Sequence, residues 1–280
     1  MASLPAVDGD MGWRVAGFLR DAADTHILPE LTGGGRSPAA VKAEGGLVTR
    51  VDGAVQAAIQ QDLAEDYPGI RLLGEEMPPA EHRRLVAEAG SGLWCLDPLD
   101  GTSNFASGIP VFGISLALLV EGEPVLGVVL DPLRDELFTA IRGQGAWLDD
   151  EPIGVQTGRS LKQSVGVVDF KRLDPGVARR LAGEQPFHCQ RNFGSSVLEW
   201  CWLACGRVDF YLHGGQNLWD FAAGSLIAAE AGAAVATMDG EPLFAGDILR
   251  RSILAVADSG LRSQLAPHLC PGDDEAEMEG

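Results

Sequence analysis

The chain is poor in positive charge. It carries 21 basic against 40 acidic residues, a net charge of −19, and its only lysines are Lys42, Lys162 and Lys171. Such a surface repels nucleic acid and anionic membranes, so we expect no direct partner of either kind. It also repels phosphate esters, unless bound cations invert the local charge. A phosphate-binding site on this chain therefore needs metal ions.

Paired cysteines are missing as well. The five cysteines are odd in number and form no CxxC motif, which favours a reduced, cytoplasmic protein over a disulfide-bonded one. Cys201 and Cys205 are one helical turn apart, but no histidine or further cysteine stands at ligand spacing, so they indicate packing more than a metal site. No run approaches the ~20 apolar residues of a membrane-spanning helix, and residues 1–14 lack the apolar core of a signal peptide.

What the chain does have is enough apolar sequence for a large core, because 46% of its 280 residues are hydrophobic. We expect an N-terminal half over residues 1–150 and a C-terminal half over residues 151–268 that closes the site. Residues 269–280 hold five acids and little else, which predicts a disordered tail.

The order of hydrophobic patterns predicts an α/β (α+β) fold. Two stretches with helical spacing come first, a series of short apolar runs joined by tight turns follows, and the second half alternates strands with helices. The predicted helices are 15–31, 53–66, 78–89, 173–183, 195–206, a helix after Asp220, and 259–266. The predicted strands are 70–73, 92–96, 112–120, 125–130, 136–141, 145–148, 165–168, 208–212, 235–238 and 253–256. Such an order suits a layered sandwich whose first sheet is largely antiparallel.

One stretch carries most of the chemistry. The buried strand predicted over residues 92–96 ends on Asp97, because Pro98 has no N–H with which to continue regular pairing. Asp97, Asp100 and the Leu99 carbonyl can then converge, and oxygen-only clusters suit hard cations such as Mg²⁺. The N–H groups of residues 101 and 102 can meet an anion such as phosphate. The alternative is a solvated turn, since Asp-Pro and Asp-Gly are common turn dipeptides.

Two motifs resemble the inositol monophosphatase family of Mg²⁺-dependent phosphomonoesterases. Residues 97–105 read Asp-Pro-Leu-Asp-Gly-Thr-Ser-Asn-Phe, and residues 219–224 read Trp-Asp-Phe-Ala-Ala-Gly, followed by Glu-Ala-Gly at 230–232. Both are similar to that family's signatures and stand in its order. The resemblance implies the layered α-β-α-β-α sandwich of the sugar-phosphatase type. Asp220 could also be a plain helix cap, and the small residues after it would let that helix approach a sheet closely.

The resemblance implies a ligand set for two Mg²⁺, with a third possible near Glu75. The implied metal ligands are the carboxylates and the one carbonyl of Glu75, Asp97, Leu99, Asp100 and Asp220. Glu75 would also orient the attacking water, and no covalent phosphoenzyme is expected.

Residues 42–52 add two further expectations. Lys42 followed by Val-Thr-Arg-Val-Asp at 48–52 resembles a loop and helix start of the same family. The resemblance implies that Lys42 holds a metal-bound water or the phosphate, and that Asp52 stands behind the nucleophilic water with Thr102. The alternatives are a solvated loop lysine and a plain helix cap at Asp52.

The substrate is less defined. The resemblance implies that Gly101, Thr102 and Asp220 face the substrate, and that Ser195 and Ser196 line its side of the site. Family members that prefer inositol phosphates carry a Glu shortly before the second signature, where this chain has His213, which could hydrogen-bond a polyol or be an exposed loop residue.

Inositol monophosphate is therefore the default substrate. Nucleotide bisphosphates, fructose bisphosphate and histidinol phosphate are alternatives on the same metal core. A regulatory binding protein that keeps the fold is the non-enzymatic alternative. Family members are often homodimers, and we expect one here.

Overall fold

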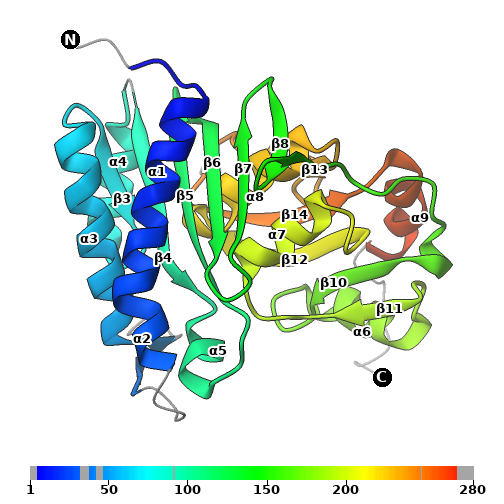
Figure 1. Cartoon of the computed structure of the whole chain (residues 1–280). Coiled ribbons are helices and arrows are strands. Elements are labelled where there is room, and N and C mark those ends of the chain that lie inside the picture. The colour runs from blue at the N-terminus through cyan, green and yellow to red at the C-terminus, as the bar shows by residue number, and fades with distance from the viewer. Residues whose placement is uncertain (1–4, 32–37, 42–46, 91, 247, 270–280) are drawn as a thin grey trace.

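The computed structural model describes residues 5–31, 38–41, 47–90, 92–246 and 248–269. Within them, two mixed β-sheets lie roughly side by side, with helices packed on and between them (Figure 1). A short antiparallel pair, β1 (Ala40–Val41) with β2 (Leu47–Val48), stands apart from both sheets. Lys42 falls between these two strands and lies outside the described residues.

The larger sheet has seven strands in the order β3-β4-β5-β6-β7-β8-β9. Its strands are β3 (Arg71–Gly74), β4 (Leu93–Asp100), β5 (Gly113–Val120), β6 (Glu123–Asp131), β7 (Glu136–Ile141), β8 (Gly145–Leu148) and β9 (Glu151–Pro152). Only β3 and β4 pair in parallel, and the other neighbours are antiparallel. The prediction of a largely antiparallel first sheet is confirmed.

The smaller sheet has five strands in the order β11-β10-β12-β14-β13. Its strands are β10 (Val165–Asp169), β11 (Cys189–Arg191), β12 (Phe210–Asn217), β13 (Ala234–Ala236) and β14 (Arg250–Val256). Strand β10 runs parallel to both of its neighbours, whereas β14 is antiparallel to β12 and β13. Strands β11 and β9 are too short to show a pattern in the sequence.

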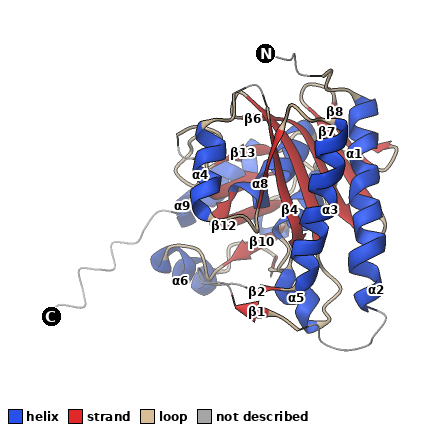
Figure 2. Ribbon diagram, turned by 90° about the vertical axis from the view of Figure 1, so that its left-hand side faces the viewer, coloured by secondary structure: helices blue, strands red, loops and turns tan. Residues whose placement is uncertain are grey.

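The helices complete five layers. They are α1 (Gly9–Ala22), a π-helical turn η1 (Ala23–Ile27), α2 (Leu28–Leu31), α3 (Arg50–Asp66), α4 (Pro79–Ala87), α5 (Thr102–Ser107), a 3₁₀ turn η2 (Leu161–Gln163), α6 (Pro175–Glu184), α7 (Ser196–Ala204), α8 (Leu218–Glu230) and α9 (Ser259–Leu269). Helices α1 and α3 cover one face of the larger sheet, α7 and α8 lie between the sheets, and α6 and α9 cover the far face of the smaller sheet (Figures 1 and 2). This is the predicted α-β-α-β-α sandwich.

Alternation along β4 decides which way its side chains face. Trp94 and Leu96 pack into the core under α1 and α3, whereas Cys95 packs into the core shared with α7 and α8. Side chains two residues apart share a face of a strand. Asp97 therefore continues the Cys95 face and points toward the helices between the sheets.

Small residues let helix α8 lie very close to the larger sheet on one side and to α7 on another. A Cβ placed on Gly127 of β6 would lie 2.8 Å from the Ala223 carbonyl oxygen, and one on Gly224 would lie 2.4 Å from Trp200 Cβ. Neither distance is sterically possible, so glycine is required at both positions. The close approach predicted from the small residues of this helix is confirmed.

Several boundaries differ from the sequence prediction. Strand β12 continues to Asn217 instead of ending at residue 212, so His213 lies in a strand and is buried, and the alternative of an exposed loop residue is wrong. Two further differences have a clear local cause. The first helix begins at Gly9, six positions before residue 15, because the Asp8 side chain caps it by accepting from the Met11 N–H at 3.0 Å. Strand β4 does not end at Asp97 but continues to Asp100. Its pairing passes Pro98 through an irregular register, the kind of position where proline is tolerated in a sheet.

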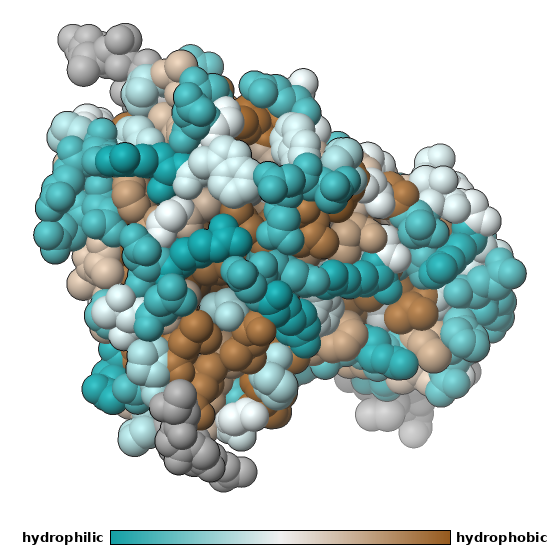
Figure 3. Space-filling model, in the orientation of Figure 1, coloured by the Kyte–Doolittle hydropathy of each residue, from teal (hydrophilic) through white to brown (hydrophobic). Residues whose placement is uncertain are grey.

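The two sheets are built from separate parts of the chain, residues 71–152 and 165–256. The division at residue 150 and the disordered tail stay predictions, and residues 270–280 lie outside the described part. Hydrophilic side chains cover most of the face in Figure 3, with hydrophobic ones gathered between them in its middle and lower part. Among the helices of the described residues, none has the length and apolar character of a membrane-spanning segment.

Candidate metal centre and active site

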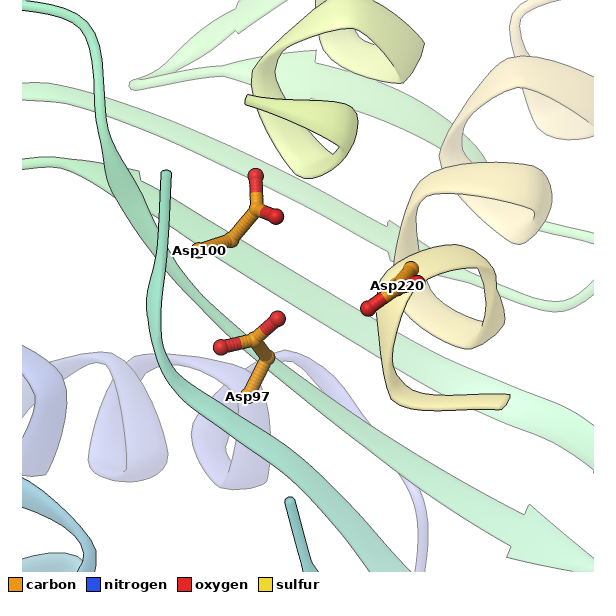
Figure 4. A group of neighbouring side chains, drawn as sticks. All are labelled: Asp97, Asp100 and Asp220. Carbon is orange, nitrogen blue, oxygen red and sulfur yellow. The ribbon is translucent and has the colours of Figure 1, made fainter. Parts of the chain in front are cut away.

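Three carboxylates from two separate elements meet beside the carboxyl end of β4. Asp97 and Asp100 belong to β4, and Asp220 is the third residue of α8. One oxygen of each lies within 4.8 Å of the others, and Figure 4 shows the three groups turned toward one another. Convergent carboxylate oxygens are the ligands that a divalent hard cation prefers.

An irregularity in β4 brings Asp97 and Asp100 to the same side. Residues three apart on a regular strand face opposite ways. Here Asp97 lies opposite Ser115 and Asp100 opposite Gly113, so β4 holds one residue more than β5 over this interval. A bulge of this kind re-aims a side chain, and it turns the Asp100 carboxylate toward that of Asp97.

Burial and mutual repulsion disfavour the charged form of all three groups. Burial, with the negative charges of Glu75 and Asp100, raises the pKa of Asp97 well above its usual range. Burial and the charges of Asp100 and Glu75 raise the pKa of Asp220 in the same way. Burial raises the pKa of Asp100 to about 6. A bound divalent cation would offset this concentration of negative charge, so the residues fit a metal site.

Hydrogen bonds fix two of the three carboxylates from outside the cluster. Asp100 Oδ2 accepts from Ser195 Oγ at 2.6 Å and from the Val197 N–H at 3.1 Å, at the start of α7. Asp220 Oδ2 accepts from the Asn217 N–H at 2.9 Å as part of a capping box. The N-cap of α8 is thus Asn217, and Asp220 is the N3 residue of its capping box. Asp220 also belongs to the acidic cluster, because the start of α8 lies at the site.

Glu75 lies in the turn after β3 and faces the same cluster. Its negative charge raises the pKa of Asp97 and of Asp220. Two backbone N–H groups hold the turn: the Glu75 N–H donates to the Leu96 carbonyl at 3.1 Å, and the Glu76 N–H donates to the side-chain oxygen Oε1 of Gln56 at 3.1 Å. The parallel pairing of β3 with β4 thus brings Glu75 beside Asp97.

Thr102 and Asp52 form a polar contact at the edge of the cluster. The Thr102 hydroxyl lies 3.0 Å from Asp52 Oδ1 and 2.9 Å from the Leu99 carbonyl oxygen, so its single proton can be given to either. Asp52 is fully buried and is the N3 residue of the capping box of α3, whose N-cap is Thr49. It accepts from the Thr49 N–H and hydroxyl at 2.8 and 2.7 Å. Burial raises the pKa of Asp52, opposed by the hydrogen bonds from Thr49 and Thr102.

Gly101 makes the turn that carries Thr102 into the site. Its φ of +87° lies in the left-handed region, and an added Cβ would lie 2.9 Å from the Val111 carbonyl oxygen. Only glycine accepts both conditions without strain. Asn104 secures the same turn, because its amide donates to the carbonyls of Val111 and Phe193 at 2.8 and 2.7 Å.

A cavity of about 240 Å³ opens over the acidic cluster. It brings together the predicted site residues with three exceptions. Lys42 lies outside the described part, Asp52 stands behind Thr102, and Ser195 is buried and donates to Asp100 instead of lining the cavity. The predicted residues that line it are Glu75, Asp97, Leu99, Asp100, Gly101, Thr102, Ser196, His213 and Asp220.

Among the other residues of the cavity, the sequence reasoning missed four polar side chains far from the motifs: Asp169, Arg172, Asn192 and Glu199. None belongs to a motif, and each is an ordinary polar residue in sequence. Glu199 lies in α7 and accepts from the N–H groups of Phe193 and Gly194 at 2.6 and 3.2 Å. Burial raises its pKa to about 7, against these hydrogen bonds. A charged residue in an otherwise apolar helix is the one signal that could have drawn attention to it.

His82 links the two segments that carry Glu75 and Asp220. It is buried in α4, its Nε2 lies 2.9 Å from the Gly74 carbonyl oxygen, and its ring centre lies 4.7 Å from that of Trp219. Since Gly74 and Trp219 directly precede Glu75 and Asp220, this imidazole fixes the spacing between two of the clustered carboxylates.

Comparisons with known proteins agree with this geometry. The sequence matches the inositol monophosphatase family over residues 6–272. It is 37% identical over 206 residues to the Pasteurella multocida protein named Nus factor SuhB, covering 71% of this chain and 75% of that protein. The structure resembles the Thermotoga maritima IMPase with a TM-score of 0.79 and 28% identity, covering 97% of this chain and all of the other (100%). It also resembles a staphylococcal IMPase-II with bound inositol monophosphate, with a TM-score of 0.76, 26% identity, and 92% and 96% of the two chains covered.

Proposed function

The chain belongs to the inositol monophosphatase family, and we propose that it is a Mg²⁺-dependent phosphomonoesterase acting on a small phosphorylated polyol. One observation carries the proposal. Carboxylate oxygens of Asp97, Asp100 and Asp220 converge within 4.8 Å in a cavity that Glu75 and Thr102 also line. A protein that had kept the fold for binding alone would have no need of this intact acidic set.

The proposed cofactor is Mg²⁺, two ions per subunit and a third near Glu75 as a further possibility. Asp97, Asp100, Asp220, Glu75 and the Leu99 carbonyl would hold them. When bound, the ions acidify water and neutralise the charge that develops on the transferred phosphoryl group and its leaving oxygen. Four carboxylates balance two divalent cations in charge, so a phosphate dianion can then enter a site that would otherwise repel it.

Thr102 is proposed to orient the attacking water. When its hydroxyl proton is given to Asp52, 3.0 Å away, the hydroxyl oxygen is left as an acceptor on the cavity side. A water that donates one hydrogen to Thr102 and the other to Glu75 directs a lone pair at the phosphorus. Asp52 keeps this arrangement because its other oxygen is held by Thr49.

The backbone at the turn is proposed to bind the phosphate. The N–H groups of Gly101 and Thr102 follow the two ligand residues of β4 directly, so a phosphate oxygen beside the metals would lie next to them. Successive N–H groups in a turn form a concave anion site. Ser196, which lines the cavity between two residues that donate to Asp100, is proposed to contact the esterified alcohol.

Inositol monophosphate is the default substrate. It is supported by the family match and by the staphylococcal relative, whose structure holds inositol monophosphate. Nucleotide bisphosphates, fructose bisphosphate and histidinol phosphate remain alternatives on the same metal core. The homodimer and the cytoplasmic location also stay predictions.

A second proposal belongs to a different class. Relatives of this chain are named Nus factor SuhB, so a regulatory protein-binding role could accompany or replace catalysis. The acidic cluster favours the enzyme, because protein binding does not need four convergent carboxylates. Turnover decides between the two roles.

The test is phosphate release from a panel of phosphomonoesters, with Mg²⁺ and with chelator. The panel holds inositol 1-phosphate, 3′-phosphoadenosine 5′-phosphate, fructose 1,6-bisphosphate, histidinol phosphate and phenyl phosphate. We expect Mg²⁺-dependent turnover, with inositol 1-phosphate the best substrate. Absence of turnover on every member with Mg²⁺ present would overturn the phosphatase proposal and favour the binding protein.

A further inference from the structure

The cavity is also lined by a carboxylate outside the acidic cluster, that of Asp169, which has an imidazole beside it. Asp169 ends β10 and His213 lies in β12, and the two are direct partners across the parallel pair. Both line the cavity. His213 Nε2 lies 3.4 Å from Asp169 Oδ2. A carboxylate and an imidazole therefore face the space that the alcohol part of a substrate would fill.

The hydrogen bonds of His213 decide which of the two can receive a substrate hydroxyl. The Gly215 N–H donates to His213 Nδ1 at 3.1 Å, so Nδ1 carries no proton and the neutral ring is protonated on Nε2. That proton faces Asp169. Burial lowers the pKa of His213, which keeps the ring neutral near pH 7. Both nitrogens are thus engaged within the protein, and His213 keeps no acceptor for a ligand.

Asp169 keeps acceptor capacity. Its Oδ1 accepts from the Lys171 N–H at 3.0 Å, and its Oδ2 faces His213 and, at 3.9 Å, Arg172 Nε. An ionised carboxylate has about four acceptor positions, so these contacts leave room for hydroxyl donors. Burial would raise its pKa, but the hydrogen bond from His213 and the charge of Arg172 outweigh this and lower it. Asp169 is therefore a charged acceptor whose side chain is 18% exposed, in the cavity.

Close packing keeps this pair in place. A Cβ on Gly214 would lie 1.6 Å from the Arg172 carbonyl oxygen, so the turn after Asp169 lies directly against the backbone that follows His213. Any side chain at position 214 would displace one of the two segments. The fold thus holds Asp169 at a fixed distance from the acidic cluster, as selection between substrates of different shape requires.

We propose that Asp169 is a specificity-determining residue that accepts hydrogen bonds from the hydroxyl groups of a phosphorylated polyol, and that His213 is a positioning residue that orients Asp169. This inference rests on the proposed function for the place of the phosphate. It predicts that polyol phosphates bind more tightly than simple alkyl phosphates, and that the difference depends on Asp169.

The experiment measures binding, so that it does not depend on turnover. Calorimetry with Ca²⁺, which takes oxygen ligands as Mg²⁺ does, gives Kd values for inositol 1-phosphate and ethyl phosphate. In the wild type we expect inositol 1-phosphate to bind about tenfold more tightly, the effect of a hydrogen bond to a charged acceptor. In Asp169→Asn we expect this ratio to fall to about one, with the Kd of ethyl phosphate changed less than about twofold.

Two further comparisons separate selectivity from folding. Asp239→Asn, which makes the same charge change at an exposed turn outside the cavity, should keep the wild-type ratio. His213→Leu removes the donor to Asp169 and should lower the ratio severalfold, whereas His213→Gln keeps an N–H donor and should restore part of it. If His213 had a purely structural role, its substitution would change the Kd of both ligands equally, and glutamine would not restore the ratio.

Each outcome decides the proposal. Three results would overturn it. They are a Kd ratio near one in the wild type, an unchanged ratio in Asp169→Asn, and an equal loss of affinity for both ligands in that variant. The phosphatase proposal is judged separately, by turnover of phenyl phosphate, which offers no hydroxyl to Asp169. Selective binding without turnover would leave the Asp169 inference standing and remove the enzyme assignment.

Discussion

The two groups of residues that line the cavity differ in how the chain supplies them. The metal wall (Glu75, Asp97, Asp100, Asp220) places two of its carboxylates on one strand and is held by backbone pairing and helix caps. The substrate wall (Asp169, Arg172, Asn192, Ser196, Glu199, His213) is assembled from separate elements of the smaller sheet and α7. The first is therefore visible as motifs in the sequence, whereas the sequence indicated only Ser196 and His213 of the second.

The difference also separates their expected roles. On the metal wall, burial and mutual repulsion disfavour the charged form of the carboxylates, and a bound cation would offset this. On the substrate wall, Asp169 is balanced by His213 and Arg172 without any added ion. We therefore expect changes on the metal wall to affect catalysis as a whole, and changes on the substrate wall to affect the choice of substrate.

The largest effect is expected from Asp97→Asn. Loss of a central carboxylate should lower Mg²⁺-dependent kcat by about a thousandfold on every substrate. The same change should raise the Tm of the chelator-treated protein, because it removes a buried charge that Glu75 and Asp100 disfavour. Steady-state kinetics and thermal unfolding measure the two effects, and selective loss on polyol phosphates alone would contradict the comparison.

Thr102 gives the next largest effect. Thr102→Val removes the hydroxyl that contacts Asp52 and should lower kcat by about a hundredfold, with KM changed little. Thr102→Ser keeps the hydroxyl and should retain most of the activity. If valine and serine proved equally active, the hydroxyl would have no part in orienting the water.

His82 tests whether the spacing of the metal wall matters. His82→Ala removes the contact with the Gly74 carbonyl and should raise the Mg²⁺ concentration for half-maximal activity by about tenfold. His82→Gln, which keeps an N–H donor, should restore part of the affinity. The KM for substrate at saturating Mg²⁺ should stay close to that of the wild type, since His82 does not line the cavity.

The smallest effect is a pH dependence of stability. Folding raises the pKa of Asp100 from 3.8 to about 6, so the folded state binds protons more tightly than the unfolded state. The associated stability is complete below pH 3.8 and is lost as the pH rises through about 6. In chelator, Tm should therefore rise by a few degrees between pH 8 and pH 5.5 relative to Asp100→Asn. Saturating Mg²⁺ should weaken this dependence, because the cation replaces the protons.

Much of the fold could be read from the sequence, and the reasons are physical. The apolar runs of β5 and β6 and the small residues of α8 carry strong local patterns, so their type and packing were predictable. The bulge after Asp97 was not, because the sequence shows Pro98 as a stop and does not show that pairing resumes at Asp100. The first helix start was missed because the Asp8 cap precedes the apolar pattern.

The residues of the candidate site also differ in whether the local sequence predicts them. Asp97, Asp100 and Thr102 lie within six residues, so local chemistry fixed their proximity. Asp169 could not be found, because its place in the cavity depends on the parallel register of β10 with β12. Sequence alone left His213 as the polar group of the substrate wall, whereas the hydrogen bond from Gly215 commits its ring to Asp169.

Metal binding by the acidic cluster is the central claim, and calorimetric titration of Mg²⁺ into chelator-treated protein at pH 7.5 tests it most directly. The wild type should show saturable binding at millimolar concentrations or below, and Asp97→Asn should lose it while remaining folded by thermal unfolding. Absence of saturable binding in the wild type, or equal binding in Asp97→Asn, would contradict the account.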